Sequence, residues 1–286
     1  MRWQDREGSN NVEDARGSSG GGGMGGGKPI GIIGLIILLI GAYNGVDLSG
    51  LVGGANQLGN TQQQQTRPQQ YSQQEQQLFK LSSVVLRETE KVWGAYFQKM
   101  GWTYQEPVLQ IYSGATRTGC GTGQASAGPF YCPADNKLYI DLSFYNTMKN
   151  QLGAEGDAAF AYVIAHEVGH HVQTLLGTID KVHNMQQQLG TKPEANALSV
   201  KLELQADCYA GVWGYYAQKD GLFEDGDIEE AYTAAEAVGD DTLQQRAQGY
   251  TVPHTYTHGT SAERKKWLQR GLQTGDINQC DTFAVQ

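Results

Sequence analysis

Hydrophobic residues recur at roughly every third or fourth position through several long stretches of the chain, which is the spacing of an α-helix with one buried face. The first stretch follows Ser72-Gln73-Gln74-Glu75, whose ends have the spacing of a capping box, and it stops at Gly101. Its hydrophobic positions are Leu78, Leu81, Val85, Val92, Trp93, Tyr96 and Met100. Further helices are predicted over about 158–176, 195–219, 227–238 and 260–272.

Two shorter segments predict strands. Residues 108–112 and 137–145 are rich in aromatic and β-branched side chains, and the second of them alternates. Segment 137–145 is a candidate edge strand to which an extended peptide could add by backbone pairing, and an ordinary sheet strand is an equal alternative. The whole pattern predicts one α+β domain over residues 72–286, mostly helical with a small β-sheet.

The chain before residue 72 has a different character. Residues 1–28 are polar and glycine-rich, which predicts a disordered tail. Residues 29–46 are eighteen uncharged positions dominated by Ile, Leu and Gly, enough for one short transmembrane helix. Residues 47–71 are rich in Gln, Asn and Gly and predict a flexible linker.

Basic residues flank this hydrophobic segment on one side. Arg16 and Lys28 precede it, and no further basic residue follows until Arg67. The positive-inside rule therefore predicts a single-pass protein with a cytoplasmic N-terminus and its folded domain on the periplasmic or extracellular face. A cleaved signal peptide is disfavoured by the long leading segment and by the lack of an A-x-A-like site.

The cysteines agree with that location. All four cysteines follow the predicted span, and an even number in an oxidising compartment favours two disulfides. Cys120–Cys132 would close a short glycine-rich loop, and Cys208–Cys280 would pin the C-terminal tail to the helix over 195–219; the sequence leaves the other pairings open.

The net charge of −9 and the absence of a basic patch in the sequence argue against nucleic acid as a partner.

The helix over 158–176 contains His166-Glu167-Val168-Gly169-His170. Positions i and i+4 share one face of a helix, so both imidazoles can bind one metal ion. Glu167 can then take a proton from a metal-bound water. The helix is hydrophobic nearly all round and so is expected to be buried, where histidines need a partner such as a metal. The alternative is a core helix with hydrogen-bonded histidines.

A second helix supplies carboxylates. Glu203-Leu204-Gln205-Ala206-Asp207 lies within the segment 195–219. Glu203 would complete a His-His-Glu set with a fourth position open to water, which is typical of catalytic rather than structural zinc. Asp207, one turn later, could hold a ligand imidazole by its other nitrogen. Two solvated surface acids are the alternative.

The oxyanion of a tetrahedral intermediate needs a further donor. His258 is the first candidate, with His254 and Tyr256 on the same loop as second choices. The alternative is that His258 only orders the start of the helix over 260–272. His171 and His183 are expected to be structural or exposed, because one step along a helix turns His171 about 100° from the metal face.

Several of these strings resemble a known family. An HExxH motif followed by a helical ExxxD is similar to the glutamate-type zincins, which use the second motif's glutamate as third zinc ligand. Tyr131-Cys132-Pro133, residues 166–173 and 203–213, and His258-Gly259-Thr260-Ser261 resemble the bacterial predicted neutral zinc metallopeptidase family, essentially over the whole chain. The resemblance implies a zincin-like fold, a zinc site and a membrane anchor, and it leaves the substrate open.

The sequence therefore predicts a membrane-anchored metallopeptidase that hydrolyses a peptide or protein substrate with one catalytic zinc ion. Two alternatives come from other classes: a membrane-tethered, non-catalytic zinc-binding scaffold, and a zinc amidase acting on cell-wall material. Glu167 argues against the scaffold, because a structural site needs no base. The motifs do not separate the two hydrolases, since the amide chemistry is the same, and they leave the oligomeric state open.

Overall fold

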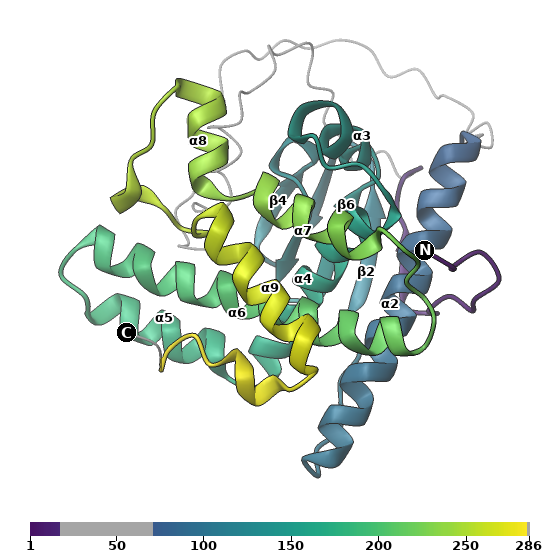
Figure 1. Cartoon of the computed structure of the whole chain (residues 1–286), viewed down its shortest axis with the longest axis horizontal. Coiled ribbons are helices and arrows are strands. Elements are labelled where there is room, and N and C mark those ends of the chain that lie inside the picture. The colour runs from purple at the N-terminus through teal and green to yellow at the C-terminus, as the bar shows by residue number, and fades with distance from the viewer. Residues whose placement is uncertain (18–70, 285–286) are drawn as a thin grey trace, which may run out of the picture.

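The computed structural model describes residues 1–17 and 71–284 (Figure 1). Helices form most of this part and pack against a small sheet, which confirms the predicted α+β class. The predicted span, residues 29–46, and nearly all of the linker lie outside the described residues. Within the described ranges, none of the helices has the length and hydrophobicity needed to cross a membrane.

The main sheet has four strands in the order β1-β2-β6-β5. β1 (Val12–Asp14), β2 (Val108–Tyr112) and β6 (Lys137–Asp141) are parallel, and β5 (Phe130–Cys132) runs antiparallel to β6. A separate hairpin joins β3 (Ala115–Thr118) to β4 (Gly121–Gln124). The prediction of an edge strand over 137–145 is wrong, because β6 has a neighbour on each side.

The strand at β6 is also shorter than predicted. The Asp141 carboxylate accepts hydrogen bonds from the backbone N–H groups of Gly114 and Ser143, at 2.7 and 2.9 Å, and turns the chain out of the sheet. The short helix α3 (Phe144–Thr147) and the π-helical turn η3 (Met148–Leu152) follow. Period-two hydrophobicity alone does not reveal this turn, because Phe144 and Tyr145 continue the aromatic pattern.

The helices begin and end close to the predicted positions. The capping boxes Ser72/Glu75 and Thr260/Glu263 are both formed. The long helices are α2 (Gln73–Lys99), α4 (Asp157–Leu175), α6 (Lys192–Lys219) and α9 (Ser261–Thr274). Shorter ones are α5 (Thr178–Gln188), α7 (Asp227–Ala237), α8 (Asp240–Gln248) and the 3₁₀ turns η2 (Ala125–Ala127), η4 (Pro253–Thr255) and η5 (Ile277–Cys280).

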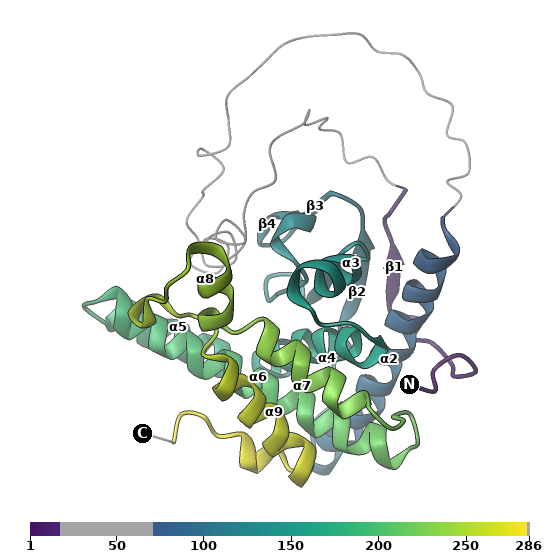
Figure 2. The same ribbon diagram turned by 45° about the horizontal axis from the view of Figure 1, so that its top comes forward.

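Helix α4 lies at the centre of the molecule, in contact with α2, α6 and α7, while α9 lies along α6 (Figures 1 and 2). Two glycines permit close helix contacts. A Cβ atom on Gly169 would lie 3.0 Å from the Ala206 carbonyl oxygen, and one on Gly211 would lie 2.2 Å from the Leu268 carbonyl oxygen. The first contact brings the HExxH helix against the helix that carries Glu203.

Residues 1–17 correct the predicted disordered tail. Val12–Asp14 is a sheet strand, and Trp3 is buried in the main hydrophobic core. The glycine-rich composition that favoured disorder belongs to residues 18–28, which lie outside the described part of the chain. Trp3 and Val12 are isolated hydrophobic residues among polar ones, so no periodic pattern marked this segment as folded.

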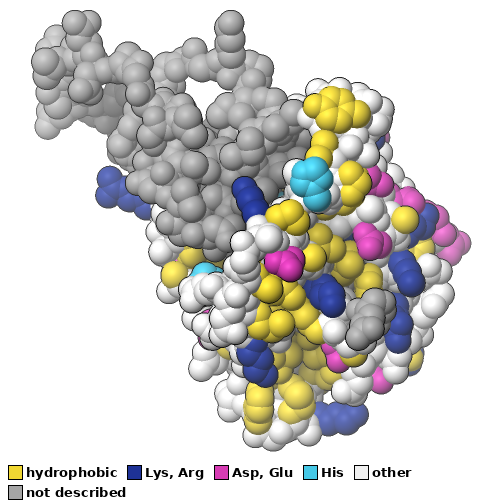
Figure 3. Space-filling model, turned by 90° about the vertical axis from the view of Figure 1, so that its left-hand side faces the viewer, with side chains coloured by type: hydrophobic (Ala, Val, Ile, Leu, Met, Phe, Trp, Pro, Cys, Tyr) yellow, Lys and Arg dark blue, Asp and Glu magenta, His cyan; other side chains and the backbone are white. Residues whose placement is uncertain are grey.

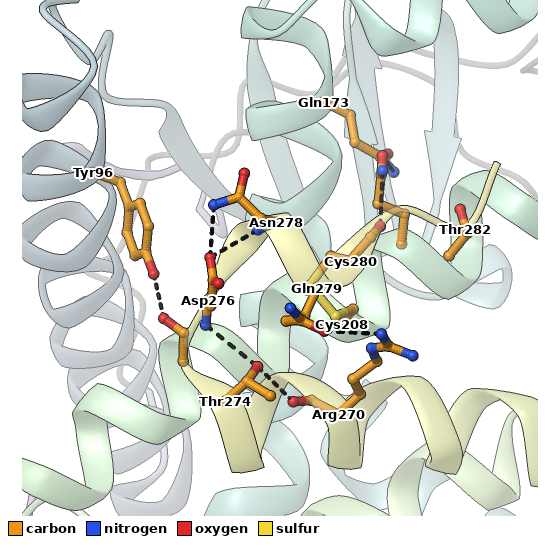
Figure 4. The surroundings of a disulfide bond; sticks show 12 residues. Tyr96, Gln173, Cys208, Arg270, Thr274, Asp276, Asn278, Gln279, Cys280 and Thr282 are labelled. Carbon is orange, nitrogen blue, oxygen red and sulfur yellow. Dashed lines mark hydrogen bonds between the residues drawn. A yellow bond between two sulfur atoms is a disulfide. The ribbon is translucent and has the colours of Figure 1, made fainter. Parts of the chain in front are cut away.

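Both predicted disulfides are present. Cys120–Cys132 joins the β3–β4 turn to β5, and Cys208–Cys280 joins α6 to η5. Figure 4 shows the second bond, with Arg270 of α9 donating a hydrogen bond to Gln279 beside it. The Gln205 amide donates to the Cys280 carbonyl at 3.1 Å, so the C-terminal segment packs on the helix of Glu203.

Candidate metal centre

His166, His170 and Glu203 converge on one point between α4 and α6. The Nε2 atoms of His166 and His170 lie 3.2 Å apart. They lie 3.1 and 3.4 Å, respectively, from the two Glu203 carboxylate oxygens. Ligand atoms about 2.0–2.1 Å from a tetrahedral zinc ion are separated by roughly 3.3 Å, so this spacing fits zinc.

The protonation pattern of the two imidazoles also fits a cation. The Asp207 carboxylate only accepts hydrogen bonds, so the Nδ1 atom of His166, 2.8 Å away, carries the proton. Gln173 donates through its nitrogen to the Leu202 carbonyl, so its oxygen accepts from Nδ1 of His170 at 2.9 Å. In neutral histidines both Nε2 lone pairs therefore point at the Glu203 carboxylate, an arrangement that a positive charge must relieve.

The charges around His166 also favour a cation at this site. Desolvation lowers the pKa of His166, but the Asp207 carboxylate and hydrogen bonds to Asp207 and Glu203 outweigh it and raise the pKa to about 10. Burial likewise opposes ionisation of Glu203, yet His170 and His258 hold its pKa well below the usual range. The site thus keeps the Glu203 carboxylate charged, and either a proton or a metal ion could balance that charge.

A buried group of charged and polar side chains supports His166 from behind. The Arg264 guanidinium donates to both oxygens of Asp207, at 2.9 and 3.0 Å, and to the Tyr162 hydroxyl at 3.1 Å. Tyr162 donates to Asp207 at 2.5 Å. Burial raises the pKa of Asp207, but the neighbouring Arg264 cation reverses this, so the pKa is lowered and Asp207 stays ionised.

Glu167 follows the first ligand on α4 and is only half-buried. Among the described residues its side chain has no hydrogen-bond partner. Burial raises the pKa of its carboxyl group, and the charges of His170 and His166 partly oppose the rise. The Glu167 carboxyl group thus lies near enough to His166, His170 and Glu203 for their charges to act on it, and its free oxygens could accept a proton there.

His258 lies on the loop before α9, close enough to Glu203 for their charges to interact. Its Nδ1 atom lies 3.2 Å from Oδ1 of Asp240, the first residue of α8. The other Asp240 oxygen accepts from the backbone N–H groups of Thr257, His258 and Gly259. Desolvation lowers the pKa of His258, but Glu203 and Asp240 outweigh it and the pKa is raised, which favours the imidazolium ion.

The remaining predicted candidates lie elsewhere. His254 is exposed, Tyr256 is half-buried on the same loop, and His183 is exposed on α5. His171 is buried against Tyr131, and its Nε2 atom donates to the Gln105 carbonyl at 2.6 Å. His171 thus has the structural surroundings expected from its angle on the helix.

Sequence reasoning did not identify Arg264, Tyr162, Gln173 or Asp240. Tyr162 lies one turn before His166, and Gln173 one turn after His170, so helical spacing was an available signal for both. Arg264 and Asp240 come from other helices, and no local pattern connects them to the HExxH helix.

One face of the molecule is shown in Figure 3. On this face basic and acidic side chains are interspersed, and hydrophobic side chains gather in a hollow strip between them. Basic residues form no continuous patch on this face.

Comparison with known proteins gives one family and several relatives. The family model described as "Putative neutral zinc metallopeptidase" matches residues 1–283. The chain is 56% identical to the uncharacterized protein YpfJ of Escherichia coli (strain K12) over 290 residues, 99% of each chain. It is 46% identical over 193 residues to the uncharacterized protein Rv2575 of Mycobacterium tuberculosis (strain ATCC 25618 / H37Rv), 64% of each chain. No solved structure matches it.

Proposed function

The chain belongs to this neutral zinc metallopeptidase family, and from that premise we propose that it hydrolyses peptide bonds with one zinc ion held by His166, His170 and Glu203. The observation that carries the proposal is the convergence of two imidazole lone pairs and a carboxylate at zinc-ligand spacing, with Glu167 beside them. A purely structural zinc site has four protein ligands. Among the described residues only three gather here.

Zinc bound at these ligands would lower the pKa of a coordinated water towards neutral and polarise a scissile carbonyl. The chain's own residues supply the remaining steps. Asp207 fixes the His166 tautomer, and Arg264 keeps Asp207 ionised. Glu167 accepts the proton of the attacking water and delivers it to the leaving amine, because the same group serves as base and then as acid.

His258 is the proposed donor to the developing oxyanion. Its raised pKa favours the imidazolium ion, and Asp240 fixes its loop and its Nδ1 atom. Nε2 is then the free donor. A cationic donor stabilises developing negative charge more strongly than a neutral one.

The substrate is proposed to lie along β5, one of the two edges of the main sheet. β5 packs against α4, and its Tyr131 contacts His171, the residue after the second histidine ligand. A peptide in extended form could pair with this edge by backbone hydrogen bonds. This transfers to β5 the role first assigned to 137–145.

The domain is proposed to act outside the cytoplasm. Its two disulfides close without leaving a free cysteine among the described residues, as expected in an oxidising compartment. Attachment to a membrane through residues 29–46 rests on the sequence alone. The proposal names no partner beyond a peptide or protein substrate.

The test is hydrolysis by the purified full-length chain, assayed on unfolded proteins and on purified cell-wall material, beside Glu167→Gln. Cleavage of proteins that falls about 10²–10⁴-fold in the variant supports the peptidase. Release of cell-wall amines alone would replace it with the amidase. No turnover of either substrate, with zinc bound, would favour the scaffold.

A further inference from the structure

Residues 1–17 form part of the catalytic domain. In the parallel pairing of β1 with β2, Val12 lies beside Leu109 and Asp14 beside Ile111. The Leu109 N–H donates to the Asn11 carbonyl, and the Ala15 N–H donates to the Ile111 carbonyl, both at 2.8 Å. β1 thus satisfies backbone groups of β2 that would otherwise be left at an open edge.

Trp3 connects this segment to the metal helix. Its side chain is only 7% exposed, within the main hydrophobic core. Its indole N–H donates to the Asp157 carboxylate at 2.6 Å. Asp157 is the first residue of α4, the helix that carries both histidine ligands.

Two buried carboxylates of α2 also have partners in the segment. Glu88, 4% exposed, pairs with Arg6 at 3.2 Å. Glu90, 3% exposed, accepts from the Ser9 hydroxyl at 2.5 Å and from the Asn11 amide at 2.8 Å. Each carboxylate also has a basic partner within α2, Lys91 for Glu88 and Arg87 for Glu90. Residues 1–17 add the further hydrogen bonds that these buried groups need, so this face of α2 is suited to receive the segment.

The described residues on either side of 18–70 lie close together. The Arg16 guanidinium stacks 3.7 Å from the centre of the Tyr71 ring and also lies over Phe79 of α2. Figure 2 shows β1 running beside α2. Arg16 and Tyr71, the described residues near each end of 18–70, therefore lie at the same edge of the domain.

This geometry is incompatible with one membrane crossing between residues 17 and 71. A hydrocarbon core is about 30 Å thick, whereas paired strands are about 4.8 Å apart. A single crossing would put β1 and β2 on opposite faces. Exchange of β1 with a second copy would not help, because every copy in the same orientation has the same separation.

The basic residues give weaker support to a cytoplasmic N-terminus than their count implies. Arg16 is 8% exposed and donates to both oxygens of Asp14, at 2.8 and 2.6 Å. Its charge is therefore paired inside the folded domain. Lys28 alone remains as a basic residue directly before the hydrophobic segment.

We propose that residues 1–17 and the catalytic domain occupy the same compartment, so that the chain crosses any membrane an even number of times, zero included, between residues 17 and 71. This replaces the single-pass orientation inferred from the flanking charges. It does not depend on the peptidase activity.

The test is a disulfide between β1 and β2 in the full-length chain. Glu13 and Gln110 are register partners, and adjacent strand positions fall within the Cα separation that a disulfide needs. The double variant Glu13→Cys/Gln110→Cys is oxidised in membranes prepared without detergent, and the protein is then digested with trypsin. A disulfide-linked pair of peptides 7–16 and 100–117 is expected, at the same yield before and after solubilisation. Linkage only after solubilisation would overturn the proposal.

The control pair is Glu13→Cys/Lys181→Cys, since α5 lies on the far side of the domain from β1 and should give no link (Figure 2). If neither double variant forms a disulfide, the labelling of exposed single cysteines provides the test instead. Asn10→Cys and Lys181→Cys are treated with a membrane-impermeant maleimide in spheroplasts. Equal labelling, or equal protection, supports the proposal. Labelling of one with protection of the other contradicts it.

Discussion

Asp207 lies at the boundary between the metal site and the core, because one of its oxygens faces His166 while both receive hydrogen bonds from Arg264. A carboxylate with no exposed surface stays ionised only next to such a cation. Arg264 is equally buried, so neither charge has water as a substitute partner. The two residues are expected to act as a unit.

Arg264→Met should therefore lower the free energy of unfolding by about 3–5 kcal/mol, because the buried Asp207 carboxylate loses its guanidinium partner and keeps only its hydrogen bonds from His166 and Tyr162. The measurement is urea denaturation of the full-length chain. Adding Asp207→Asn to the variant should recover part of the loss, since it removes the buried negative charge that Arg264 balanced. A single-variant loss below about 1 kcal/mol would contradict the buried pair.

His171 gives a prediction about pH. Burial lowers its pKa to about 4, and the bond to the Gln105 carbonyl only partly opposes this. Between the unfolded value near 6.5 and about 4, the unfolded chain binds the proton and the folded chain does not. The contribution of His171 to the free energy of unfolding is therefore fully present above about pH 6.5. It falls as the pH drops, by on the order of 3 kcal/mol at pH 4.

The measurement compares urea denaturation of the wild type and His171→Gln from pH 7 to pH 4, both stripped of metal so that the metal ligands titrate alike. The variant should be less stable at pH 7 and lose less stability on acidification. Parallel curves would show that His171 is not buried as a neutral imidazole.

Side chains of the candidate site differ in how far the sequence predicted them. The sequence pointed to His166, Glu167 and His170 because the spacing of residues on one helix is a local pattern. It pointed to Glu203 because Glu203 and Asp207 have the same four-residue spacing on a second helix. Asp207 lies 2.8 Å from Nδ1 of His166, which is the geometry that its predicted role requires. Arg264 and Asp240 were missed because their roles arise only when α8 and α9 pack against the site.

At the scale of elements, close contact between helices positions the ligands. Gly211 of α6 faces Gly271 of α9 and the Leu268 carbonyl, and a side chain there would meet backbone, which does not yield easily. Gly94 in α2 is a matched control, because a Cβ atom at that position has no neighbour within 4 Å.

Gly211→Ala is expected to destabilise the protein by at least about 2 kcal/mol through forced separation of α6 and α9. Gly94→Ala should instead be neutral or stabilising by about 0.5–1 kcal/mol, because alanine has the higher helix propensity. Thermal denaturation of both variants checks this. Equal effects of the two substitutions would mean that α6 and α9 do not approach as closely as described.

Element prediction succeeded where periodicity extended over many residues and failed where it was short. α2, α4, α6, α7 and α9 have sustained helical patterns, and β2 was predicted with its observed bounds. β1 and β5 have three residues each, too few for a period-two signal. The position of β6 inside the sheet depends on pairing with β2 on one side and β5 on the other, which no single segment encodes.

At the scale of the whole molecule, the first seventeen residues change the definition of the domain. A fragment starting at residue 72 would lack β1, Trp3 and the hydrogen bonds that Arg6, Ser9 and Asn11 donate to Glu88 and Glu90. Experiments on the metal site therefore require the full chain.

Trp3→Ala should lower the free energy of unfolding by about 3–5 kcal/mol, the usual range for removal of a buried aromatic side chain. Trp102→Ala is the control: Trp102 is 55% exposed at the end of α2, and its removal should change stability by about 0.5 kcal/mol or less. Urea denaturation of the two variants separates the cases. Similar small effects would indicate that residues 1–17 do not pack on the domain.

We propose that His166, His170 and Glu203 hold one zinc ion and that the neighbouring Glu167 is the catalytic base. Elemental analysis of the purified full-length chain, with Glu203→Gln and Glu167→Gln measured in parallel, tests it most directly. We expect one zinc ion per chain in the wild type and in Glu167→Gln, and loss of zinc in Glu203→Gln. A wild-type chain without zinc, or zinc retained in full by Glu203→Gln, would contradict it.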